Sequence, residues 1–85
     1  TDEWNLNVYP NPTDGIFYVN IDLPGIEDVE LKIYTPVGRL ILNEKYQHQF
    51  GNTRLSVNLT GYKKGMYIVQ ITTKSGVASK QIILR

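Results

Sequence analysis

Apolar residues recur at every second position in this chain, and this period excludes a helical domain. Phe17, Val19, Ile21 and Leu23 fall on one side of an extended segment, with polar or tyrosine residues between them. No window of eleven residues keeps the apolar stripe of an amphipathic helix without a glycine or proline inside it. The sequence therefore predicts an all-β fold.

The same alternation predicts seven strands, with turn signals at intervals of roughly 8–12 residues. In chain order, the expected strands cover residues 6–8, 17–23, 29–33, 39–47, 55–59, 67–71 and 77–84. In the fourth strand, Leu40 and Leu42, and with them Tyr46, are expected to share one face. This spacing is typical of a seven-stranded, immunoglobulin-like antiparallel β-sandwich, although the Cys…Trp…Cys core of antibody domains is absent.

Two of the connections have the chemistry of hairpin turns. Pro36 presets the φ angle of a turn, and Gly38 can take the positive φ that closes a type I turn with a bulge. Lys74-Ser75-Gly76 is expected to join the last two strands in the same way. The sequence thus predicts both the strands and two of the reversals between them.

The two halves of the chain carry opposite charge. The 85 residues have a net charge of +1, but residues 1–44 hold all eight carboxylates and sum to −6, whereas residues 45–85 sum to +7. Pairing between early and late strands would turn part of this asymmetry into internal complementarity. A domain of this size buries only ~60% of the surface of its unfolded chain, so its stability is marginal.

No arrangement of residues predicts catalysis or a bound cofactor. The chain has no cysteine, and its only histidine, His48, stands in a polar stretch beside an expected turn. The carboxylates from Asp22 to Glu30 lack the regular spacing of a calcium loop, and no glycine-rich turn leads from a strand into a helix. The sequence therefore predicts neither an enzyme nor a cofactor or metal site.

The sequence offers two kinds of candidate binding surface. The cations of the second half are spread over several strands and turns, with only Lys63 and Lys64 adjacent, which favours solvated strand ends over a nucleic-acid surface. Tyr18, Tyr34 and Tyr62 could expose rings for stacking on sugars, although packing on the sheet faces is the simpler explanation. If the rings are exposed, the function would be that of a surface adhesion or carbohydrate-binding module, which is kept as the alternative function.

Four segments carry a specific pattern in a fixed order. They are Val-Tyr-Pro-Asn-Pro-Thr-Asp-Gly at 8–15, Ile-Tyr-Thr-Pro-Val-Gly-Arg at 33–39, Leu-Thr-Gly-Tyr-Lys-Lys-Gly-Met-Tyr-Ile-Val-Gln-Ile at 59–71, and Lys-Gln-Ile-Ile-Leu-Arg at 80–85. In the first, Pro12 holds Asn11 extended and Asp14-Gly15 reverses the chain, which makes a rigid corner.

Together these segments resemble the type A C-terminal sorting domain of the Bacteroidetes type IX (Por) secretion system, over about residues 5–85. The residues that match the motifs of that family are Pro10, Asn11, Pro12, Gly15, Gly38, Gly61, Gly65 and Tyr67. The resemblance implies a sorting signal without catalytic activity. Its cargo would enter the periplasm with a Sec signal peptide, be recognised by the outer-membrane translocon and its shuttle protein, and reach the cell surface.

The resemblance also implies two functional segments. The translocon would recognise the closing segment, formed by Lys80, Gln81, Ile82, Ile83, Leu84 and Arg85. A sortase-like cysteine transpeptidase would cut ahead of the sandwich, in the region formed by Thr1, Asp2, Glu3, Trp4 and Asn5, and the cargo would be attached to the surface or released. Residues 1–4 are then a tether and residues 5–85 the sorting domain.

The ends of the chain carry two further expectations. The chain begins without Met and without the basic and apolar regions of a signal peptide, so we expect it to be a piece of a longer polypeptide. The final strand is expected to present unpaired edge groups, which would let it add to the sheet of a partner or form an edge-strand dimer.

Overall fold

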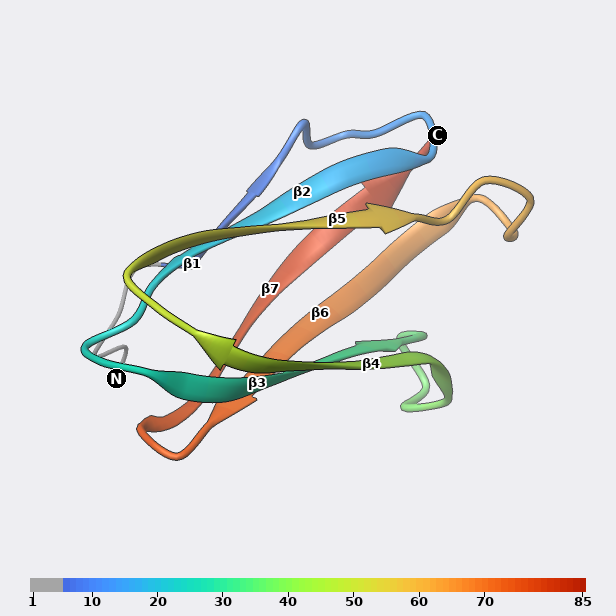
Figure 1. Cartoon of the computed structure of the whole chain (residues 1–85). Helices are drawn as coiled ribbons and strands as arrows, with labels where there is room; N and C mark the ends of the chain where they lie inside the picture. The colour runs from blue at the N-terminus through green and yellow to red at the C-terminus, as the bar shows by residue number, and fades with distance from the viewer. Residues whose placement is uncertain (1–5) are drawn as a thin grey trace.

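The computed structural model describes residues 6–85, which form seven strands and no helix (Figure 1). The strands are β1 (Leu6–Tyr9), β2 (Ile16–Asp22), β3 (Glu27–Tyr34), β4 (Leu40–Gln49), β5 (Asn52–Asn58), β6 (Gly65–Thr73) and β7 (Gly76–Leu84). All seven expected strands are present, so the prediction of an all-β fold is confirmed. Nowhere in this range is there a helix long and apolar enough to cross a membrane.

Two antiparallel sheets make the sandwich. The smaller sheet has the order β1-β2-β5 and the larger has the order β4-β3-β6-β7. In a constant-type immunoglobulin domain the fourth strand belongs to the sheet of the first, second and fifth strands. Here β4 pairs with β3 instead. The expected immunoglobulin-like sandwich is confirmed, with its fourth strand moved to the larger sheet.

The core lies between the sheets and contains alternate residues of the strands, as the period of two predicts. Its buried apolar side chains are Leu6, Phe17, Val19, Ile21, Leu23, Val29, Leu31, Ile33, Leu55, Val57, Leu59, Tyr67, Val69, Ile71, Ala78, Ile82 and Leu84. Residues from both ends of the chain belong to this one cluster, so the first and last strands are part of the same cooperative unit.

β4 departs from the predicted alternation. The register between β3 and β4 shifts between Ile33 and Tyr34. Leu42 therefore lies opposite Ile33, but Leu40 lies opposite Tyr34. Ile41 is the extra residue, and it turns Leu40 to the outer face, where the side chain is 45% exposed. The prediction that Leu40 shares a face with Leu42 is therefore wrong, whereas Leu42 does pack against the core.

A second irregularity in β4 contains His48. The register shifts between Glu27 and Val29 of β3, and His48 on the partner strand has a φ of 56°. Its backbone N–H donates a hydrogen bond to Asp28 Oδ1 at 3.1 Å. His48 is exposed, as expected, but it lies within a strand at a bulge held by a carboxylate and not in a loop.

Glu27, the first residue of β3, is a buried carboxylate. Its Oε2 accepts a hydrogen bond from Ser75 Oγ at 2.8 Å in the turn between β6 and β7, and Oε1 has no hydrogen-bond partner. Burial alone would raise the pKa of Glu27. Hydrogen bonds from Ser75 and Thr73, and the charge of Lys74, together hold the pKa below its ordinary value of 4.5. Glu27 therefore ties β3 to the last hairpin in its charged form.

We expect Glu27→Gln to lower the free energy of unfolding at pH 7 by about 1–2 kcal/mol, because it removes charge-assisted hydrogen bonds. Since the folded pKa lies below 4.5, this stabilisation is present above that pH and is lost as the pH falls through the folded pKa. Urea unfolding should therefore show that, from neutral to acidic pH, the free energy of unfolding falls less steeply in Glu27→Gln than in the wild type. Glu44→Gln, at an exposed carboxylate, is the control and should keep the wild-type slope. An unchanged slope in Glu27→Gln would contradict this account.

Candidate functional site

The motif segments gather at one end of the sandwich. Successive strands run in opposite directions, so the β1–β2, β3–β4 and β5–β6 connections lie at the same end as the last residue of β7, on the right in Figure 1. These connections are residues 10–15, 35–39 and 59–64, and we call this end the motif end. The connections at the other end contain none of the motif residues that the resemblance identified.

The first motif is hydrogen-bonded to the last strand. The Asn11 side chain donates from Nδ2 to the carbonyl oxygen of Gln81 at 3.0 Å, and its Oδ1 accepts from the backbone N–H of Ile83 at 3.0 Å. The backbone N–H of Thr13 donates to the carbonyl oxygen of Ile83 at 2.8 Å, and its carbonyl oxygen accepts from the N–H of Arg85 at 2.9 Å. We call these hydrogen bonds from Asn11 and Thr13 the clasp.

The clasp corrects the expectation of an unpaired final edge for the last part of β7, which is otherwise the edge strand of the larger sheet. Thr13 forms a parallel bridge with Leu84, so the segment after β1 takes the place of a neighbouring strand along the last part of β7. Asn11 suits this position because its amide offers a donor and an acceptor on one side chain, while Pro10 and Pro12 have no backbone N–H to offer. The peptide bonds before both prolines are cis. An edge-strand dimer through the end of β7 would have to displace the clasp.

Thr13 and Gly15 lock the corner that follows. Thr13 is buried, and its Oγ1 donates to the carbonyl oxygen of Ile16 at 2.8 Å and accepts from the N–H of Gly15 at 3.1 Å. The carbonyl oxygen of Gly15 accepts from the N–H of Leu59 at 2.8 Å. A Cβ on Gly15, whose φ is 154°, would lie 2.5 Å from Thr60 Oγ1. Gly15 is therefore required by the close approach of the β5–β6 connection.

The other two connections of the motif end are closed by their own hydrogen bonds. Gly38 has a φ of 89° and its N–H donates to the carbonyl oxygen of Thr35 at 2.9 Å, so the positive φ predicted for this turn is confirmed. Tyr67, a buried residue of β6, donates its hydroxyl hydrogen to the carbonyl oxygen of Lys63 in the β5–β6 connection. Gly61 and Gly65 flank this contact. The matched glycines and Tyr67 thus shape loops, whereas Asn11 makes a contact between segments.

The closing segment contains two buried and four exposed side chains. Ile82 is fully buried and Leu84 is 4% exposed, so both belong to the core. The remaining side chains of the segment are exposed, namely Lys80, Gln81, Ile83 and Arg85. The exposed set is the part of the predicted recognition segment that a partner can contact. The expected cleavage residues Thr1, Asp2, Glu3, Trp4 and Asn5 lie outside the described residues.

The charge division of the sequence becomes a division between the ends of the sandwich. Cations predominate at the motif end and carboxylates at the other. The motif end has Arg39, Lys63, Lys64 and Arg85 and one carboxylate, Asp14. The opposite end has Asp22, Glu27 and Asp28 and one cation, Lys74. Arg85 Nε lies 3.0 Å from Asp14 Oδ1, the one ion pair between the two halves of the chain within residues 6–85. Both side chains are mostly exposed, so this pair adds little stability. The expected internal complementarity is seen in this contact, in the charge of Lys74 near Glu27, and in Lys45, which lies opposite Glu30 across β3 and β4.

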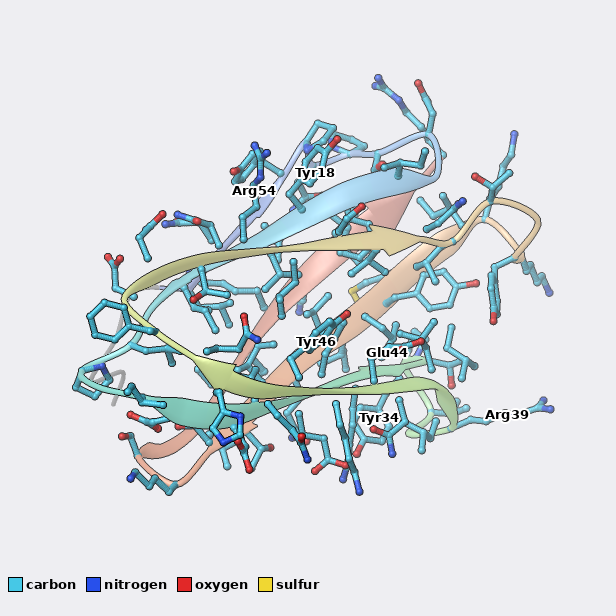
Figure 2. All side chains as sticks on the ribbon, viewed as in Figure 1. Tyr18, Tyr34, Arg39, Glu44, Tyr46 and Arg54 are labelled. Atoms are coloured by element: carbon cyan, nitrogen blue, oxygen red, sulfur yellow. The ribbon has the colours of Figure 1, made fainter. Side chains whose placement is uncertain are left out.

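The three tyrosines proposed for sugar stacking do not share a surface. Tyr18 lies on the outer face of the small sheet, Tyr34 on the outer face of the large sheet, and Tyr62 in the β5–β6 connection; Figure 2 shows the first two on opposite sides. Tyr18 instead lies beside Tyr9, with ring centroids 5.8 Å apart, and under the guanidinium of Arg54 at 5.0 Å. Within residues 6–85, no three or more histidine or carboxylate side chains converge on a metal site.

The clasp is the part of this site that sequence reasoning missed. Asn11 and Ile83 are 72 positions apart, and neither residue type indicates its partner. The available signal is chemical, since the two prolines lack a backbone N–H and the asparagine between them adds a donor and an acceptor on its side chain. That signal predicts that Asn11 caps the edge of a strand, but it does not identify the strand.

Comparison with known proteins agrees with these motifs. The family model described as the secretion system C-terminal sorting domain matches residues 7–85, from within β1 to the residue after β7. No curated protein matches the chain. The matched range contains the clasp and all three connections of the motif end. The chain therefore belongs to the family of secretion system C-terminal sorting domains, the sorting signals of type IX secretion.

Proposed function

We propose that the translocon and its shuttle protein read the motif end as a folded surface, through the exposed side chains of residues 80–85. Family membership makes the domain a type IX sorting signal, in a family that is not an enzyme family, and implies export to the cell surface or secretion. The observation that supports the finer proposal is the clasp. Because Asn11 and Thr13 already occupy backbone groups of the closing segment, its side chains are what remains for a partner.

The proposed route follows the family. The cargo and its sorting domain cross the periplasm, are passed through the outer membrane, and meet a sortase-like cysteine transpeptidase at the surface. We place the cut within Thr1 to Asn5, with residues 1–4 as the tether and residues 5–85 as the sorting domain. Since β1 begins at Leu6, a cut ahead of it leaves every strand of the sandwich intact, which supports this position.

A reporter with a signal peptide and this domain at its end tests the proposal in a type IX-competent bacterium. The double variant Lys80→Ala/Ile83→Ala removes two exposed side chains and leaves the buried Ile82 and Leu84 in place. We expect surface display to fall by about tenfold, the loss typical of a truncated interface contact. Thermal unfolding of the purified domain should change by less than about 1 kcal/mol.

Val77→Ala is the matched control, because Val77 is an exposed apolar residue of the same strand, 57% exposed, outside the closing segment. Its reporter should reach the surface at the wild-type level. Wild-type display of Lys80→Ala/Ile83→Ala would overturn the assignment of residues 80–85 as the contact. Retention of the unmodified fusion inside the cell would count against export by this domain itself, so the two failures are separable.

A further inference from the structure

A groove opens at the motif end between the β3–β4 turn and the β5–β6 connection. It has a volume of about 520 Å³, and neither the clasp nor the closing segment lines it. Its cations are Arg39, Lys63 and Lys64, all exposed, and Figure 2 shows Arg39 extending from the turn into solvent. The groove is therefore a surface separate from the one proposed for the translocon.

The groove is positively charged without compensation. No carboxylate lines it, and none of its three cations forms an ion pair with another residue in the range 6–85. Asp14, the carboxylate of the motif end, pairs with Arg85, and the remaining acidic residues near a sandwich end lie at the opposite one. A surface with this potential attracts and orients an anionic partner.

The groove also has an apolar wall. Pro36, Ile41 and Met66 line it beside the cations, and Tyr62, which is 40% exposed, adds an aromatic ring. A phosphate or a lipid headgroup would engage the cations but leave this wall without a partner. A peptide in which carboxylates alternate with apolar side chains would use both, since the two kinds of group then fall side by side along an extended chain.

We propose that this groove binds an extended acidic segment of a partner protein, with carboxylates on Arg39, Lys63 and Lys64 and apolar side chains against Pro36, Ile41 and Met66. The site goes beyond the sorting function and is independent of the contact proposed for residues 80–85. It gives the domain a second point of attachment. The cations of the groove would orient a negatively charged partner toward this surface.

Titration of the 85-residue chain with a short blocked peptide of alternating aspartate and leucine, followed by NMR chemical shifts, tests the proposal. We expect a Kd of roughly 10–100 µM at low salt, with shifts centred on the lining residues. Lys63→Gln/Lys64→Gln should weaken binding by about tenfold, and raised salt should weaken it further. Both substitutions are at exposed side chains, and circular dichroism verifies that the fold is kept.

Lys74→Gln is the matched control, since Lys74 is an exposed cation at the opposite end, and it should bind the peptide as the wild type does. A peptide of aspartate and serine, and inorganic phosphate, test charge without apolar contacts and should bind at least about tenfold more weakly. The proposal is overturned by equal binding of either probe, by binding that survives Lys63→Gln/Lys64→Gln, or by no binding of the aspartate–leucine peptide. Preferential binding to phosphatidylglycerol vesicles would assign the groove to a membrane surface instead.

Discussion

Ile82→Ala is expected to lower the free energy of unfolding by about 2–5 kcal/mol, because truncation of a fully buried isoleucine loses its burial and leaves a cavity. Domains of this kind have a total stability of roughly 5–15 kcal/mol, so the variant would lose a large share of it. Urea unfolding followed by far-UV circular dichroism gives the difference. The same variant, in the reporter fusion, should lose surface display together with stability.

Ile83→Ala is the matched control for the unfolding measurement. Ile83 is the next residue of the same strand, but its side chain is 39% exposed, so its truncation should cost about 1 kcal/mol or less. The clasp is unaffected, since it uses the backbone of Ile83 and not its side chain. Equal losses of stability in the two variants would contradict the burial of Ile82 in the core and the exposure of Ile83.

This pair of variants bears on how the sorting signal is tested. Deletion of residues 80–85 removes Ile82 and Leu84 from the core and leaves Asn11 without its partners. A truncated chain would thus lose its fold and its exposed contact side chains at the same time. Loss of export after truncation cannot separate the two causes, whereas substitutions at exposed and buried positions of one strand can.

The sequence was sufficient for the strands because strand formation here depends on a local period of two. Phe17 and Val19 alternate with outward residues regardless of what β2 pairs with, and both are buried as predicted. Leu40 was misplaced because its direction depends on a bulge, and a bulge is a property of the register between β3 and β4. Register is set by the partner strand, which local alternation does not contain.

The candidate site likewise combines features that follow from local residues with features that follow from the topology. The turn at Gly38 follows from local residue chemistry and was predicted, whereas the clasp between Asn11 and Ile83 follows from topology and was not. The charge asymmetry was visible along the chain, but only the direction of the strands sorts Lys63 and Arg85 to one end and Asp28 to the other. The sequence thus predicted the components of the motif end, and the fold determined that they meet.

Gly15→Ala is expected to lower the free energy of unfolding by about 2–4 kcal/mol, from backbone strain and steric overlap together. The new Cβ would lie 2.5 Å from Thr60 Oγ1 at a φ of 154°. The backbone of Gly15 cannot easily move aside, because its N–H is held by Thr13 Oγ1 and its carbonyl oxygen by the N–H of Leu59. Thermal or urea unfolding of the purified domain measures the loss.

Thr60→Ala, added to Gly15→Ala, should recover about 1 kcal/mol, because it removes the nearest atom while the backbone strain remains. Gly25→Ala is the control: a Cβ there meets no atom within 4 Å, and the change should be neutral or stabilise the domain by up to about 1 kcal/mol. Wild-type stability of Gly15→Ala, or the absence of coupling to Thr60, would refute the contact. A measured coupling would mean that the segment that clasps β7 is in contact with the β5–β6 connection, which lines the groove. Both surfaces of the motif end would then depend on Gly15.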